Sequence, residues 1–332
     1  MRGVRALAPA LGKILMRDSD PIFLQFGEPA GTTHTYGVAG RLIVSNRAVD
    51  ELEPFRAAAM AAPLAAPRSD MRPPPTAPVL YADRGWVGGH FALVECRRSD
   101  EGFWLGVEGA GEFLVTAQGE RIVELRGPRL RKNIGPVDAI LGPCLCLALA
   151  LGRVFCLHAS GATGGIAGRA SGGETAIVFA GQSGVGKSTL AAALDGRRRS
   201  TGKTWRRLCD DILPVAHRDG DPVVLPRFPQ LKLFAKRQWG RDRDDAIRLG
   251  ALFRLTPTAG GEPIRVQRLG GREAAVAVIR HTVAGRLFDA GLASAHLDFA
   301  GRLADQVPVY DLSVPRGLET VPEVLAALES VI

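Results

Sequence analysis

Short apolar segments separated by glycine turns run through the first third of the chain and predict strands. β-branched, aromatic and alternating apolar residues mark them at 22–26, 34–44, 79–81, 90–97, 103–107, 112–117 and 121–125. Segments of this length between turn residues are typical of antiparallel strands. The Pro- and Ala-rich stretch 54–78 interrupts them and indicates a mobile loop, because it has few residues able to build a core. We therefore expect a tail at residues 1–18 and a small antiparallel β-rich domain over residues 19–130.

The pattern changes after residue 135, where helix-like and strand-like segments alternate. We expect helices at 137–151, 188–194, 271–287, 292–306 and 322–331, and strands at 154–159, 175–180, 207–215 and 307–314, with a glycine-dense turn at 161–173. Alternation of this kind is typical of α/β proteins. The sequence thus predicts an α/β domain over residues 131–332, larger than the β-rich one.

Residues 181–188 read G-Q-S-G-V-G-K-S, a complete phosphate-loop motif between a predicted strand and a predicted helix. The loop N–H groups and the positive end of the helix favour a polyphosphate. Lys187 can reach the terminal phosphates, and the Ser188 hydroxyl can ligate Mg²⁺. The nucleotide-binding residues that we expect are Gly181, Gln182, Ser183, Gly184, Val185, Gly186, Lys187, Ser188 and Thr189. The alternative is a glycine turn that binds nothing.

Composition and charge set wide bounds on the class of protein. The 332 residues are 46% hydrophobic and 23% charged, enough apolar material for a packed core, and the net charge is +8. Such a charge suits an acidic or phosphorylated partner, but no interleaved aromatic and basic pattern favours nucleic acid. The uncharged apolar stretch 139–152 is shorter than the ~20 residues of a membrane-spanning helix.

The cysteines also indicate the cellular compartment of the protein. Their number, five, is odd, and they form neither a CxxC pair nor a cluster with histidine, so they predict reduced core thiols rather than disulfides or a zinc site. With no membrane segment expected, we predict a cytoplasmic protein.

Two adjacent acids, Asp210 and Asp211, follow the phosphate loop on the predicted strand 207–215. Neighbouring strand residues point to opposite faces, so the two carboxylates suit two roles: one holds Mg²⁺ and the other accepts a proton from an attacking hydroxyl. A solvated acidic turn is the plain alternative. His158, on the strand ahead of the loop, is either a core histidine or a neighbour that tunes Asp210.

Together these motifs, L-H-A-S-G before the loop, F-A-G-Q-S-G-V-G-K-S-T-L-A-A-A-L through it and C-D-D-I-L-P-V after it, resemble the HPr serine kinase family, whose core is related to phosphoenolpyruvate carboxykinase. The resemblance covers residues 150–330 and implies an α/β P-loop kinase core of that type. It also implies that Lys187 and the loop hold ATP, that Ser188 and Asp211 hold Mg²⁺, and that Asp210 is the base with His158 beside it. Self-association is implied as well, without a number of subunits.

Further segments are similar to the members of this family encoded beside lasso peptide clusters, which phosphorylate the C-terminal serine of a ribosomal precursor peptide. They are 34–37, 113–124, 226–233 and 307–312. The E-I-R-G-x-G signature of HPr kinases proper is missing from the sequence, so neither HPr as acceptor nor the reverse reaction is expected. We therefore expect an ATP- and Mg²⁺-dependent serine kinase of a precursor peptide. A kinase of another protein or of a small hydroxylated metabolite, and a non-catalytic nucleotide-binding regulator, stay open.

Basic residues supply further candidates. Arg227 and Lys232 follow the acids, and the resemblance implies that their segment passes near the nucleotide, where cations neutralise a transferring phosphoryl group. The crowded cations of 197–207 suit a carboxylate or phosphate, or simply a solvated loop. Arg280 and His281 fall on a predicted helix, where an exposed face is the plainer interpretation.

Overall fold

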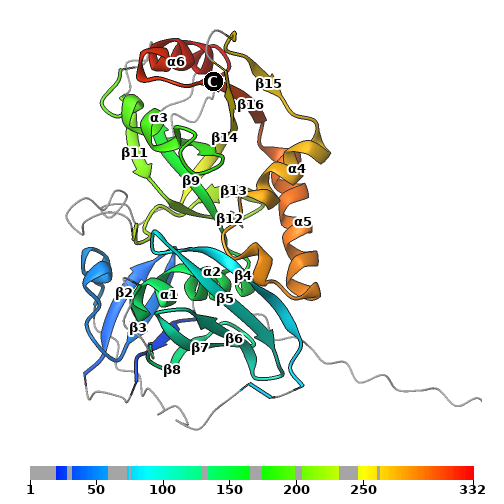
Figure 1. Cartoon of the computed structure of the whole chain (residues 1–332). Helices are drawn as coiled ribbons and strands as arrows, with labels where there is room; N and C mark the ends of the chain where they lie inside the picture. Colours follow the sequence, from blue (N-terminus) through cyan, green and yellow to red (C-terminus); the bar gives the residue numbers. More distant parts are fainter. Residues whose placement is uncertain are drawn as a thin grey trace, which may run out of the picture.

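The computed structural model of the chain describes residues 20–27, 32–58, 73–74, 76–128, 134–164, 174–198, 204–231, 246–259 and 262–332. The predicted tail 1–18 and much of the predicted loop 54–78 lie outside these residues. Of that loop, the described start belongs to a short 3₁₀ helix, η1 (Asp50–Phe55). The described part holds two sheets, drawn one above the other in Figure 1.

The first sheet contains eight of the described strands, in the order β2-β3-β1-β8-β7-β6-β5-β4. Their bounds are β1 (Ile22–Gln25), β2 (His34–Val38), β3 (Arg41–Ser45), β4 (Val79–Val87), β5 (His90–Arg98), β6 (Gly102–Val107), β7 (Gly111–Thr116) and β8 (Arg121–Arg126). The purely antiparallel prediction was wrong, because β1 inserts between β3 and β8 and runs parallel to both. The predicted strand 34–44 is a hairpin, since Ala39 and Gly40 turn the chain with φ of 50° and 71°.

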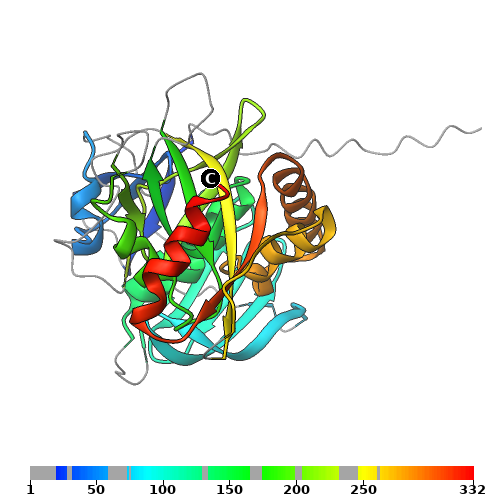
Figure 2. The ribbon, with the colours of Figure 1, turned by 90° about the horizontal axis from the view of Figure 1, so that it is seen from above.

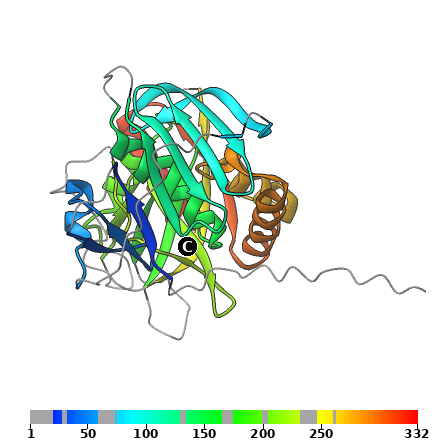
Figure 3. The ribbon, with the colours of Figure 1, turned by 90° about the horizontal axis from the view of Figure 1, so that it is seen from below.

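The predicted helix 137–151 is interrupted. It consists of α1 (Pro136–Ala139), a wider turn η2 (Ile140–Cys144) that contains Pro143, and α2 (Leu145–Leu151). The helix α2 packs against β7 and β8 of the first sheet and against β9 of the second. Figure 1 shows it between the two sheets, and Figure 3 shows the first sheet from below, in front of the second. One continuous cluster of buried side chains therefore runs from the first sheet through α2 into the second.

The second sheet also contains eight described strands. They are β9 (Phe155–Gly164), β10 (Thr175–Ala180), β11 (Arg206–Cys209), β12 (Ile212–Arg218), β13 (Asp221–Val224), β14 (Ile247–Thr258), β15 (Val266–Arg268) and β16 (Val309–Pro315). The path β10-β9-β12-β13-β14 returns to its start, because β14 pairs in parallel with β10. These five strands thus close into a small barrel, with β16 and β15 continuing from β14.

The prediction of an α/β P-loop core of the HPr kinase type was wrong as a fold class. The second half is a β-rich barrel with few helices, and the first half is a mixed sheet. Two misjudged features explain the error. The pairs β9–β10 and β12–β13 are antiparallel instead of being joined in parallel through helical crossovers. The twelve-residue strand β14, which closes the barrel, was not predicted at all.

The helices of the second half lie outside the barrel. They are α3 (Lys187–Leu194), α4 (Gly271–Arg280), η4 (Gly285–Leu287), α5 (Ala290–Gln306), η5 (Leu318–Thr320) and α6 (Val321–Glu329). The pair α3 and α6 shares a second hydrophobic cluster with β10 and β14, while α4 and α5 pack on each other away from it. Figure 2 shows α6 lying across the sheet and the α4–α5 pair to its side.

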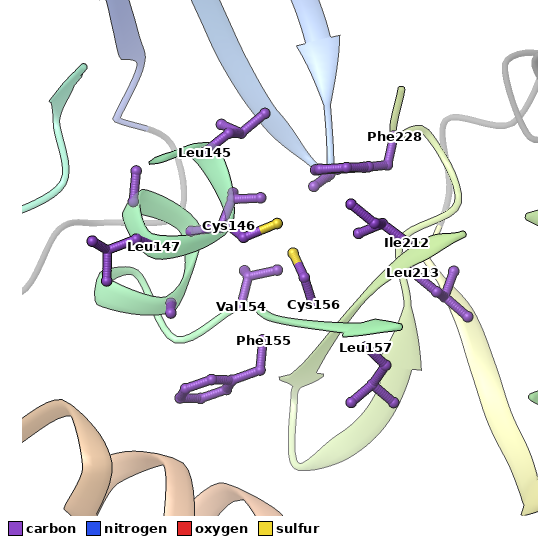
Figure 4. Close-up of a cluster of buried hydrophobic side chains, with 14 of the residues drawn as sticks. Leu145, Cys146, Leu147, Val154, Phe155, Cys156, Leu157, Ile212, Leu213 and Phe228 are labelled. Atoms are coloured by element: carbon purple, nitrogen blue, oxygen red, sulfur yellow. The ribbon is translucent and has the colours of Figure 1, made fainter. Parts of the chain in front are cut away.

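The five cysteines are buried free thiols, as the sequence predicted. Cys146 on α2 and Cys156 on β9 face each other across the contact between these two elements (Figure 4). The side-chain hydrogen bond with Cys156 and burial together raise the pKa of the Cys146 thiol well above its usual range. Cys146 therefore packs as a neutral core side chain where α2 meets the second sheet.

Candidate functional site

The phosphate-loop sequence forms a strand, a loop and a helix, as predicted locally. All six residues of β10 are buried, and α3 begins at Lys187 directly after the glycine-rich turn. Gly184 and Gly186 have φ of 81° and 105°, a region that side chains other than glycine rarely adopt. A Cβ on Gly181 would lie 2.8 Å from Val185 Cγ1. These glycines therefore fix a tight loop at the N-terminus of α3.

Lys187 is the cation of this loop. Its side chain is almost fully buried, and its ammonium donates hydrogen bonds to the carbonyl oxygens of Gly181 and Gln182, at 2.8 and 2.9 Å. Burial of a charge is tolerated only with such partners. The lysine is thus already held inside the loop, where a phosphate oxygen can exchange for a carbonyl.

The acidic pair lies in a break between two strands, so the predicted single strand 207–215 was wrong. β11 ends at Cys209 and β12 begins at Ile212, with a register shift opposite β9. The fully buried Gln230 explains the break: its side-chain oxygen accepts hydrogen bonds from the backbone N–H groups of Asp210, Asp211 and Ile212, at 3.0, 2.8 and 3.3 Å. One amide therefore replaces the ladder partners that the acidic turn lacks.

Asp210 lies beside the loop helix. The Ser160 hydroxyl donates to the Asp210 backbone oxygen at 3.0 Å and is 3.4 Å from both its carboxylate and the Ser188 hydroxyl. Arg207 forms an ion pair with the same carboxylate. Ser160, from β9, thus connects the first turn of α3 to the first acid.

Asp211 faces another direction. Its carboxylate is 3.4 Å from Nε2 of His158, and the backbone N–H of His158 donates to the His281 oxygen at 2.7 Å. Burial, with Lys187, His158, Arg254 and Arg280 nearby, lowers the pKa of His281 to about 4. The predicted neighbour of His158 was Asp210, whereas the structure pairs it with Asp211.

A second polar group lies next to the start of the loop. Arg254 on β14 is the register partner of Ala180, and its guanidinium donates to Asp311 of β16 at 2.6 Å. The Thr256 hydroxyl donates to the same carboxylate at 2.7 Å. Sequence reasoning assigned no role to Arg254 or Asp311, since the strand that carries Arg254 was not predicted.

The basic residues that the sequence suggested for the site do not all lie near the loop. The Arg227 guanidinium donates to the carbonyl oxygens of Gly37 and Phe55, at 3.2 and 3.4 Å, so its described contacts join the first sheet rather than the loop. Lys232 lies outside the described residues. In the basic stretch, Arg197 pairs with Glu329 and Arg206 with Glu174. Arg280 is exposed, as the sequence favoured, and His281 is half-buried; both line one cavity with His158 and Asp211.

Two cavities reach the loop. One, of about 440 Å³, is lined by the loop residues 182–186, Thr189 and the segment 314–324. The other, of about 1040 Å³, contains His158, Asp211 and Ser183 and extends to the β4–β5 hairpin and to residues 280–287. Cavities of this size hold small ligands or short peptide segments.

No protein-family model matches the chain, and no curated protein matches it in sequence.

Within the described residues, no cluster of three histidine, cysteine, aspartate or glutamate side chains is arranged to hold a metal ion. Over the same described part of the chain, no helix has the length and apolar character needed to cross a membrane.

Proposed function

We propose that the protein is a phosphotransferase that moves the γ-phosphoryl group of ATP to a serine hydroxyl. The observation that carries the proposal is the convergence, through Ser160, of the phosphate loop with an acidic turn that is remote in sequence. A loop that binds phosphates needs no second carboxylate site to be stable. A phosphotransferase needs both, because it must hold the donor and activate the acceptor.

The loop binds the donor. Its backbone N–H groups and the N-terminus of α3 surround the β- and γ-phosphates, and Lys187 moves from carbonyl oxygens to phosphate oxygens. The cavity lined by Thr189 and residues 314–324 takes the rest of the nucleotide, since it continues directly from the loop.

The residues beside the loop fit Mg²⁺. The Ser188 hydroxyl and the Asp210 carboxylate both lie within 3.4 Å of the Ser160 hydroxyl, so they form a patch of hard oxygen donors. Mg²⁺ prefers such oxygens and takes its other ligands from phosphates and water. When bound, the ion would neutralise charge on the transferring phosphoryl group.

The contacts favour an exchange of the roles that the sequence suggested for the two acids. Asp210 and Ser188 are both neighbours of the Ser160 hydroxyl, so Asp210 suits the metal side. Asp211 lines the larger cavity with His158, so it suits the acceptor side, where it takes the proton of the attacking hydroxyl. Arg207 and Arg254 supply positive charge nearby.

The acceptor is the molecule whose hydroxyl receives the phosphoryl group. The motifs favour a precursor peptide ending in serine, and another protein or a small hydroxylated metabolite are the alternatives with the same catalytic machinery. A non-catalytic nucleotide-binding regulator is the alternative of another kind, and it predicts nucleotide binding without transfer to any acceptor.

The test is transfer from γ-labelled ATP, with Mg²⁺, to serine peptides and to free serine. We expect Asp211→Asn to keep nucleotide binding and to lose transfer by about 10²-fold or more. Asp210→Asn should reduce the dependence of nucleotide affinity on Mg²⁺, and Lys187→Met should weaken nucleotide binding itself. Asp219→Asn, in the exposed turn between β12 and β13, is the matched control. Transfer that survives Asp211→Asn would remove the proposed base.

A further inference from the structure

The larger cavity is built by both halves of the molecule. The β4–β5 hairpin of the first sheet forms one wall, the Gly142–Pro143 turn lies alongside, and residues 280–287 form the other wall. His158, Asp211 and Ser183 lie on the second-sheet side of the cavity. Anything bound between the two walls is therefore presented to the proposed base.

The hairpin wall is held in place. Gly88 and Gly89 turn it with φ of 56° and 86°, the backbone that a two-residue hairpin turn requires. Its tip lies against α1, since a Cβ on Gly88 would come within 2.5 Å of Asp138 Oδ1. The strand β4 also contacts η4 on the opposite wall. The hairpin is thus a fixed part of the cavity.

Two aromatic side chains on this hairpin are exposed to the cavity without being covered. Trp86 and Phe91 are register partners with ring centroids 5.6 Å apart, and they are 69% and 55% exposed. Exposed aromatic pairs of this kind are more typical of binding surfaces than of free protein surface. They offer an apolar contact to a ligand.

The charged side chains that line the cavity are mostly basic. Arg84, Arg280 and Arg286 line it, while Asp211 is the one acidic side chain among its described lining residues. Arg84 has an exposed partner, Glu108, at 3.5 Å. Across the described part of the chain, no ion pair is found for Arg280 or Arg286. Guanidinium groups in this setting suit a carboxylate, which they bind in a planar, bidentate manner.

We infer that this cavity binds the acceptor as an extended peptide, with an apolar side chain against Trp86 and Phe91 and a carboxylate on Arg280 and Arg286. The role of the peptide as acceptor rests on the proposed function, whereas its binding does not. A volume of about 1040 Å³ is far more than a free amino acid fills, so a peptide is favoured over a small metabolite. The carboxylate belongs either to the C-terminus of the peptide or to an acidic side chain beside the hydroxyl.

The experiment measures peptide binding without transfer. The probes are fluorescently labelled eight-residue alanine peptides that end in Leu-Ala, with alanine replacing the acceptor serine. One has a free C-terminus, one is amidated, and one is amidated and carries an aspartate directly before the leucine. We expect the free or the aspartate-bearing peptide to bind about tenfold more tightly than the neutral one, and which of them does so identifies the source of the carboxylate.

Variants then locate the contact. The double variant Arg280→Gln with Arg286→Gln should abolish the preference for the carboxylate, and Trp86→Ala with Phe91→Ala should weaken all three peptides about tenfold. Arg272→Gln on α4 and Leu297→Ala on α5 are exposed controls outside the cavity and should bind as the unaltered chain does.

The two proposals fail separately. If the unaltered chain binds ATP but none of the peptides, or if the cavity variants bind like the controls, the inference is wrong and the phosphotransferase proposal stands. If the peptides bind as expected but ATP does not bind, the cavity is a peptide site and the proposed function is wrong.

Discussion

Gln230 shows how much one buried side chain decides at the candidate site. Its oxygen accepts from three successive backbone N–H groups, and its amide nitrogen donates to the oxygens of Ile212 and Phe228, at 2.8 and 3.1 Å. Without these bonds the acidic turn would have buried donors with no acceptor, which costs about 1–3 kcal/mol each. Gln230 therefore fixes the direction of both carboxylates.

We predict that Gln230→Ala lowers the free energy of unfolding by about 2–4 kcal/mol, because the three N–H groups lose their common acceptor. Urea unfolding followed by circular dichroism measures this loss. The exposed Gln267→Ala on β15 is the matched control and should change stability by less than about 0.5 kcal/mol. Equal losses in the two variants would contradict the role given to Gln230.

Residue types alone could locate the loop, the acids and His158, since these carry chemistry that requires short, fixed spacings. They could not assign partners. Asp211, and not Asp210, meets His158 because a break in the strand changes which way the two acids point. Nothing in the sequence marks the buried Gln230 as the cause, since its proline-rich segment has no periodicity that predicts which side chains are buried.

At the scale of elements, the helix α5 packs on the barrel through a buried histidine. His296 is 4% exposed and stacks on Phe155 of β9 with ring centroids 4.8 Å apart. The Thr282 hydroxyl donates to Val278 O at 3.0 Å, so at 2.8 Å from Thr282 the His296 Nε2 is the donor. Burial lowers the pKa of His296 to about 4.

This lowered pKa predicts a loss of stability in acid. In the unfolded chain the imidazole takes a proton near pH 6.5, whereas in the folded protein it does so only near pH 4, so the unfolded state gains protons first. The free energy of unfolding should fall between about pH 6.5 and 4, by about 1–3 kcal/mol for this residue. His281 adds to the same window. Urea unfolding at several pH values should show a shallower fall for His296→Phe, and an unchanged slope in that variant would contradict the prediction.

The element boundaries that periodicity could predict were those of α5, α6, β10 and most strands of the first sheet, where apolar spacing and turn residues agree. Periodicity did not predict the strand β14, because its sequence I-R-L-G-A-L-F-R-L-T-P-T mixes alternating charged residues with a continuous apolar run. A strand that is buried on both faces shows no regular alternation of apolar and polar residues.

At the scale of the whole molecule, the two sheets are parts of one structure. The hydrophobic core is continuous through α2, and polar links reinforce it: Arg227 donates to Gly37 O and Phe55 O, and Arg98 pairs with Asp289 at 3.0 Å. Asp289 also caps α5 by accepting from Leu292 N. Domains with separate cores can unfold separately, whereas a shared core couples them.

We therefore predict a single cooperative unfolding transition for the whole chain. Trp104 lies in the first sheet and Trp205 beside the second, so variants that retain one of these two as their single tryptophan report on each half. Their fluorescence transitions in urea should coincide with the transition seen by circular dichroism for the same variant. Arg227→Ala should lower the midpoint and keep a single transition, and separate midpoints for the two halves would show that the shared core does not couple them.

The sequence by itself determined the local features of this protein: a phosphate-loop motif at a strand-to-helix turn, paired acids, a histidine and buried thiols, because each depends on residues close together in the chain. Only the tertiary structure decided that the strands close into a barrel, that Asp211 meets His158, and that the β4–β5 hairpin and Arg280 share a cavity with them. The reason is physical. Strand pairing and cavity walls are set by contacts between residues far apart in sequence, and many pairings satisfy the same local pattern.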